Sequence, residues 1–140
     1  MMEIEKEQAW VPSHRPLNQS ERRLISLLKS MDLTAVPQAT DGHWTLDAYL
    51  PPPFHAAIEV DGPAYHTRPE DSARDRAREA ALRADGLIII RAWSFDLRTG
   101  PGRRKVRRHI LTRLLRDRGI KVRARGAEKL YRSLTDRAAR

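Results

Sequence analysis

The stretch AAIEVDGPAYH (residues 56–66) combines a short apolar run with two carboxylates one residue apart, a glycine and a histidine. Residues two apart in a strand project from the same face, so Glu59 and Asp61 share one face, and Ile58 and Val60 share the other. An ionised carboxylate near the surface of a sheet is costly unless something compensates its charge. The stretch therefore predicts a buried strand that ends beside an arginine, a proton or a metal ion.

Further strands and a helix are predicted on both sides of this stretch. A segment rich in alanine and arginine (70–86) predicts a helix, and LIIIRAW (87–93), the most apolar part of the chain, predicts a central buried strand. Such an order of strand, helix and strand is typical of a crossover between parallel strands. Upstream, GHWTLDAYL (42–50) predicts a strand that the three prolines at 51–53 connect to an antiparallel neighbour.

Three further helices complete the predicted fold. Apolar residues at helical spacing predict an amphipathic helix at 20–33, which Ser20 caps, and two helices at 103–119 and 126–140. We therefore expect an α/β domain with a mixed sheet of about four strands flanked by helices. The predicted divisions are an N-terminal arm (1–19), an α/β core (20–118) and a basic C-terminal helical extension (119–140).

Positive charge is concentrated at the C-terminal end. The formal net charge is +9, yet residues 1–100 hold 12 basic and 15 acidic side chains, whereas residues 101–140 hold 15 basic and 3 acidic ones. This asymmetry indicates a polyanion as partner, and arginine suits phosphate because its guanidinium can bind two oxygens at once. We expect DNA, with RNA as the weaker option. The alternative is a solvated helix face that contributes only solubility.

The composition argues against several other classes of protein. The sequence contains no cysteine, which excludes disulfides and thiolate zinc sites. It has no apolar run long enough to span a bilayer, and its acidic start lacks the apolar core of a secretory signal. We therefore expect a cytoplasmic protein with no membrane partner.

Asp47 is a third acid that belongs to the same candidate site. Antiparallel pairing through the proline turn brings it opposite the middle of the next strand, within reach of Glu59. Converging carboxylates bind a hard divalent cation, which we expect to be Mg²⁺ or Mn²⁺, and such an ion suits hydrolysis of a phosphodiester. A simpler explanation stays open for either acid of the opening stretch alone: Glu59 pairs with Arg91, and Asp61 caps the turn at Gly62.

The order of these features resembles the PD-(D/E)xK nuclease superfamily and, within it, the very-short-patch-repair-like endonuclease domains. An early helical glutamate, an aspartate before a strand–turn–strand, the EVDGPAYH core and the RDRAREAALRADG helix carry the resemblance, which covers residues 20–115. It implies a restriction-endonuclease-like core that cleaves DNA with Mg²⁺ or Mn²⁺. It implies metal ligation by the carboxylates of Asp47 and Glu59 and the carbonyl of Val60, and catalytic roles for Glu21, Asp47, Glu59, Asp61 and His66.

Asp61 and His66 determine which groups could stabilise the phosphate and transfer a proton during cleavage. Asp61 falls where the family has a lysine, and an acid cannot offer a positive charge to the phosphate. His66 resembles a histidine that lies beside the scissile phosphate, and it could transfer the proton instead, since histidine titrates near neutrality. The alternative for His66 is a loop histidine bonded to a backbone carbonyl.

Two functions from different classes remain. The first is a metal-dependent endonuclease that hydrolyses DNA phosphodiester bonds. The alternative is a catalytically weak or inactive nucleic-acid-binding module on a nuclease scaffold, acting as a subunit of a larger defence, repair or transposition complex. A homodimer is compatible with either function. The side chains expected to bind the nucleic acid are Arg76, Arg91, Arg103, Arg104, Lys105, Arg107 and Arg108.

Overall fold

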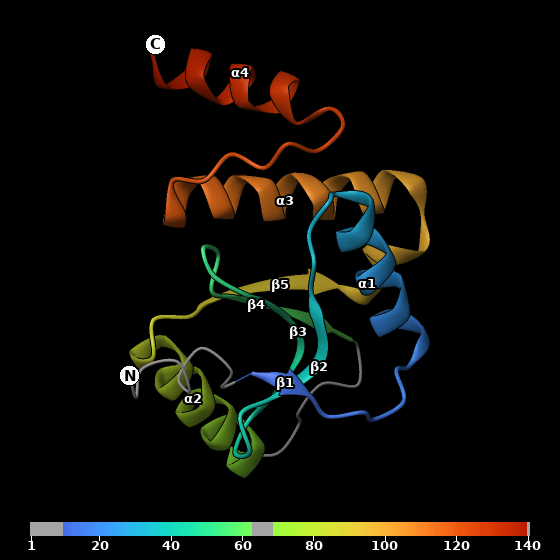
Figure 1. Ribbon diagram of the computed structural model, residues 1–140, viewed down its shortest axis with the longest axis vertical. Coiled ribbons are helices and arrows are strands. Elements are labelled where there is room, and N and C mark those ends of the chain that lie inside the picture. The colour runs from blue at the N-terminus through green and yellow to red at the C-terminus, as the bar shows by residue number, and fades with distance from the viewer. Residues whose placement is uncertain (1–9, 63–68, 140) are drawn as a thin grey trace, which may run out of the picture.

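Five strands form one mixed sheet, and helices cover both of its faces (Figure 1). The computed structural model describes residues 10–62 and 69–139. The strands are β1 (Val11–Pro12), β2 (Val36–Thr40), β3 (Thr45–Leu50), β4 (Ala56–Asp61) and β5 (Ile88–Trp93). The helices are α1 (Gln19–Ser30), α2 (Pro69–Ala84), the 3₁₀ helix η2 (Ser94–Arg98), α3 (Gly100–Arg118) and α4 (Ala127–Ala138).

The spatial order of the strands in the sheet is the same as their order in the chain, from β1 to β5. Neighbours from β1 to β4 are antiparallel, whereas α2 carries the chain back so that β4 and β5 run parallel. In the parallel pair, Glu59 lies beside Arg91 and Asp61 lies beside Trp93. The predicted mixed sheet, the hairpin through the prolines and the crossover helix are confirmed.

The sheet has five strands rather than about four, because residues of the predicted N-terminal arm pair with β2. The two residues of β1 lie opposite Ala39 and Thr40. The preceding Trp10 is buried in an apolar cluster with Leu82 of α2. β1 is too short to reach the start of β2. Pro37, which has no N–H to donate, lies in that uncovered part of the strand.

Apolar side chains form a core on each face of the sheet. Ile58 and Ala57 are consecutive in β4, so they point to opposite faces. Ile58 is buried with Leu28 of α1 and Ile110 of α3, whereas Ala57 is buried with Leu82 of α2. Glu59 and Asp61, two and four residues after Ala57, therefore point to the face that α2 covers.

α1 begins at a cap that differs from the predicted one. The Asn18 side chain accepts a 2.8 Å hydrogen bond from the N–H of Glu21, and Glu21 accepts a 2.7 Å bond from the N–H of Asn18. This reciprocal arrangement is a capping box, in which the acid stands three residues after the cap. The prediction that Ser20 caps the helix was wrong, because Ser20 lies inside it.

The C-terminal extension folds back over α3. α3 ends at Gly119, which has a φ of 68°, a conformation that favours glycine. A connecting segment (120–126) then leads to α4, which lies on the side of α3 away from the sheet (Figure 1). The expected helices of this region are present. No helix of the described residues is long and apolar enough to cross a membrane.

Candidate active site

β3 changes the face that it presents at Asp47. Residues two apart in a regular strand share a face, but Leu46 is buried in the cluster of α2 and Ala48 in the cluster of α1 and α3. The neighbouring strand is irregular at the same place: Gln38 lies between the partners of Ala48 and Leu46 and has a φ of 43°. Asp47 therefore lies where the regular alternation of the sheet is interrupted.

Asp47 and Glu59 lie against each other across β3 and β4. The N–H of Asp47 donates a 3.1 Å hydrogen bond to Oε2 of Glu59. The N–H of Val60 donates a 2.7 Å bond to Oδ2 of Asp47. Each carboxylate thus contacts the main chain of the other strand, which holds the two acids together. Their predicted approach is confirmed, whereas ligation by the Val60 carbonyl stays a prediction.

The surroundings of Asp47 disfavour its ionised form. Burial and the neighbouring Glu59 carboxylate raise the pKa of Asp47 to about 7, although the hydrogen bond from Val60 acts in the opposite direction. Glu21 raises this pKa further, through its charge and a side-chain hydrogen bond. The acid predicted on the first helix therefore joins the pair from the strands.

Glu21 also has a structural role. It is 9% exposed, and its Oε1 accepts the N–H of Asn18 in the capping box. Its Oε2 accepts a hydrogen bond from the side-chain amide of Gln38 on β2. Glu21 thus fixes the start of α1 to the irregular part of the sheet, beside Asp47.

Arg78 of α2 supplies a counter-charge that sequence reasoning left out of the site. It forms an ion pair with Oε1 of Glu59 and donates a 2.8 Å hydrogen bond to the carbonyl of Thr45. The side chains of Arg78 and Glu59 are 16% and 8% exposed. The simpler explanation from the sequence had named Arg91 as the partner of Glu59. The usable signal was helical spacing, since Arg78 stands one turn before the buried Leu82.

Asp61 is compensated by a different arginine. Nη1 of Arg91 lies 3.1 Å from Oδ1 of Asp61. Arg91 also pairs with Glu79 and lies 4.0 Å from Asp75, both on α2. Its positive charge is therefore shared among three carboxylates. Arginine, one of the three kinds of compensation expected for the opening stretch, is present for both Glu59 and Asp61.

The predicted nucleic-acid-binding residues of α3 lie along the first half of that helix. Lys105 pairs with Asp96 at 3.7 Å, and Arg107 lies 3.5 Å from Oγ of Ser30. Arg76 is exposed on α2, whereas His66 lies outside the described residues. Binding of nucleic acid stays a prediction for Arg76, Arg91, Arg103, Arg104, Lys105, Arg107 and Arg108.

Asp47 and Glu59 are the acids that could hold a cation needing few protein ligands. Within residues 10–62 and 69–139, no cluster of three or more His, Cys, Asp or Glu side chains could hold a metal ion by itself. Mg²⁺ commonly takes one or two protein carboxylates and completes its octahedron with water and phosphate oxygens. Two carboxylates such as Asp47 and Glu59 match that smaller requirement, and metal binding stays a prediction.

A solved nuclease structure has the same fold. The catalytic domain of the homing endonuclease I-Bth0305I aligns with a TM-score of 0.57 and 20% sequence identity, over 73% of this chain and 98% of that one. No family model matches the sequence, and no curated protein matches it. The chain therefore has a nuclease-like α/β fold.

Proposed function

We propose that this protein is a metal-dependent DNA endonuclease of the PD-(D/E)xK type, similar to the very-short-patch-repair domains. The observation that carries the proposal is the contact between Asp47 and Glu59 on adjacent strands of a nuclease-like fold. Buried like charges oppose each other, so a fold that keeps them together favours an added cation.

Asp47 and Glu59 would hold Mg²⁺ or Mn²⁺, with the Val60 carbonyl as a further candidate donor. A bound ion of this kind lowers the pKa of water and offsets negative charge on a phosphate. Glu21, next to Asp47, is suited to orient a water molecule by accepting its hydrogen bond. Asp47 must lose its proton for this function, which the cation would favour.

Arg78 can take over part of the electrostatic role of the absent lysine. It brings a permanent positive charge to Glu59, and its planar guanidinium suits phosphate oxygens. Arg91 offsets part of the charge of Asp61, so Asp61 would repel the substrate less than an unpaired acid would. His66 is the proposed group for proton transfer. The arginines of α3 would contact the DNA backbone, and a homodimer would present two such sites to the two strands.

The test is cleavage of supercoiled plasmid by the purified protein with Mg²⁺ or Mn²⁺. We expect nicking that is lost in Asp47→Asn and Glu59→Gln, while binding of DNA measured in a chelator is retained. Asp32→Asn, an exposed acid after α1, is the matched control and should cleave normally. Parallel incubation with RNA decides between the two nucleic acids.

One observation favours the non-catalytic alternative. Glu59 and Asp61 already have arginine partners, so the strand that would hold the ion is electrostatically satisfied without one. A binding module within a larger defence, repair or transposition complex needs no metal ion, so these ion pairs would be enough for it. Binding without cleavage for every metal and DNA form would support this alternative over the nuclease.

A further inference from the structure

Basic side chains of α3 and of the C-terminal extension face each other across a groove of about 430 Å³. Leu111 and Leu130 supply apolar surface between them. No acidic side chain lines the groove among the described residues. The basic residues that line it are Arg104, Arg107, Arg108, Arg125 and Lys129.

Helical spacing explains why these side chains meet. Residues 104, 107, 108 and 111 follow the spacing that places side chains on one face of a helix. Val106 and Ile110, on another face of α3, are buried in the core. α3 thus uses one side to pack on the sheet and presents a basic row to α4.

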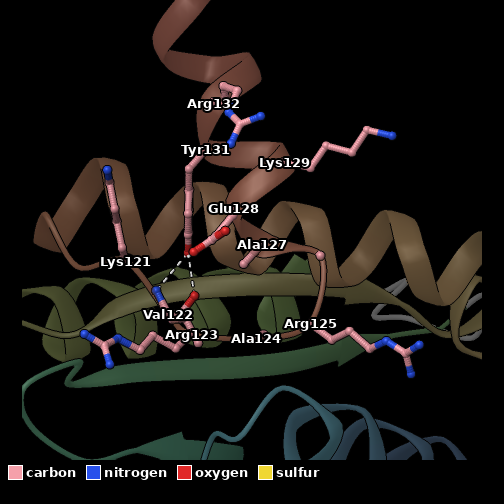
Figure 2. Close-up of a pocket in the computed structure, with 11 residues that line it drawn as sticks. Lys121, Val122, Arg123, Ala124, Arg125, Ala127, Glu128, Lys129, Tyr131 and Arg132 are labelled. Atoms are coloured by element: carbon pink, nitrogen blue, oxygen red, sulfur yellow. Dashed lines mark hydrogen bonds between the residues drawn. The ribbon is translucent and has the colours of Figure 1, made fainter.

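The C-terminal extension forms the second wall of the groove, and buried contacts fix its position. The hydroxyl of Tyr131 accepts a 2.8 Å hydrogen bond from the N–H of Val122 (Figure 2). Ala127, Ala124 and Tyr131 are buried. Arg125 and Lys129 are therefore placed by packing of the extension, and the groove exists without a ligand.

The charge of the groove is uncompensated. Within the described part of the chain, none of its five basic side chains forms an ion pair, in contrast to Arg78, Arg91 and Arg113. Like charges on fixed helices repel each other, and a polyanion relieves that repulsion. A groove with two walls fits the ridge of a phosphate backbone better than a flat anionic surface.

We propose that this groove binds the sugar–phosphate backbone of duplex DNA, which makes the C-terminal extension a DNA-binding element. The choice of DNA rests on the proposed function, but the inference concerns binding alone. The groove is separate from the carboxylates, because α4 lies on the outer side of α3 (Figure 1). Its contacts would be independent of base sequence.

The test compares two double variants of equal charge. Arg125→Ala with Lys129→Ala removes two basic residues of the groove, and Arg132→Ala with Arg137→Ala removes two from α4 outside it. Binding to a short labelled duplex is measured by fluorescence anisotropy in a chelator over a salt series. Each phosphate contact contributes about 0.9 to the slope of log K against log salt. The groove variant should reduce the magnitude of that slope by about 2 on DNA duplexes of unrelated sequence. The control variant should reduce it by far less.

Several outcomes would overturn the assignment. Equal slopes in the two double variants mean that net charge alone attracts DNA. Binding to phosphatidylserine vesicles without binding to DNA excludes DNA as the ligand. Circular dichroism melting verifies that both variants are folded. The nuclease proposal fails separately: a protein that never cleaves can still give the difference in slope, and a cleaving protein can lack it.

Discussion

The N–H of Asp47 donates a 3.1 Å hydrogen bond to Oε2 of Glu59, so that two acids on neighbouring strands lie in contact. The main chain creates this contact, because the carboxylate of Asp47 in turn accepts the N–H of Val60. Arg78 of α2 forms an ion pair with Glu59, but it forms no described ion pair with Asp47. The pKa of Asp47 therefore stays raised. Ionisation of Asp47 adds a second negative charge beside Glu59, so pH, mutation or a bound cation should change the stability of this site.

The stability of the metal-free protein should fall as the pH rises towards 7. The folded state holds the Asp47 proton up to a pKa of about 7, against 3.8 for an aspartate in the unfolded chain. Between these values the folded state binds more protons than the unfolded state, so the contribution is complete below about 4 and is lost as the pH passes 7. Asp47→Asn should abolish this loss and stabilise the protein at pH 8 by up to about 4 kcal/mol.

Urea denaturation from pH 4 to 8 in a chelator measures this effect. Asp32→Asn, an exposed acid, is the control and should follow the unmodified protein. If Asp47→Asn were less stable than the unmodified protein at pH 8, burial of an acid with a raised pKa would be excluded.

Arg78→Ala should destabilise the fold by about 3 kcal/mol, since it leaves Glu59 with an uncompensated charge in a poorly solvated position. Adding Glu59→Gln should recover part of that loss, because the neutral side chain needs no counter-charge. The double-mutant cycle in urea should give a coupling energy of about 1 to 2 kcal/mol. Arg83→Ala, an exposed arginine of the same helix, should cost less than about 0.5 kcal/mol. Additive effects of Arg78→Ala and Glu59→Gln would contradict the ion pair.

The approach of Asp47 and Glu59 was predictable because a short turn fixes the register of a hairpin. Residues 51–53 leave few ways to pair the strands, and the observed pairing of Ala48 with Ile58 puts these acids side by side. The crossover was predictable for a similar reason, since an apolar strand after a helix joins the sheet in parallel.

The partners of the acids were not predictable in the same way. Helical spacing from the buried Leu82 places Arg78 on the covered side of α2. Which acid it reaches depends on how the helix docks, and the sequence does not give that orientation. The link from Glu21 to Gln38 joins a helix to a strand through an unusual φ that propensities do not foresee. β1 was missed because two residues are too few for a periodic signal.

Arg118→Ala should destabilise the fold although its side chain forms no described ion pair. The guanidinium donates to three carbonyls, those of Phe54 at 2.6 Å, His55 at 3.1 Å and Gly86. It thereby ties the end of α3 to the proline turn and to the turn before β5. Removing hydrogen bonds from a charged donor costs about 1.5 to 3 kcal/mol. Urea denaturation should separate this variant from Arg116→Ala, whose side chain is 66% exposed and whose loss should cost little; equal stabilities would contradict a role for the three carbonyls.

Trp93→Ala should weaken binding to single-stranded DNA more than binding to duplex DNA. Trp93 is 45% exposed, its ring centroid lies 5.8 Å from that of Phe95, and it is the β5 neighbour of Asp61. Stacking of one base on an aromatic ring contributes about 1 to 3 kcal/mol, so the single strand should lose roughly 5- to 150-fold in affinity. Fluorescence anisotropy with both DNA forms measures the difference, and Trp93→Phe should restore most of it. Val11→Ala, an exposed apolar residue on β1, should bind both forms normally. An equal loss for single strand and duplex would contradict stacking, because paired bases are not free to stack on the ring.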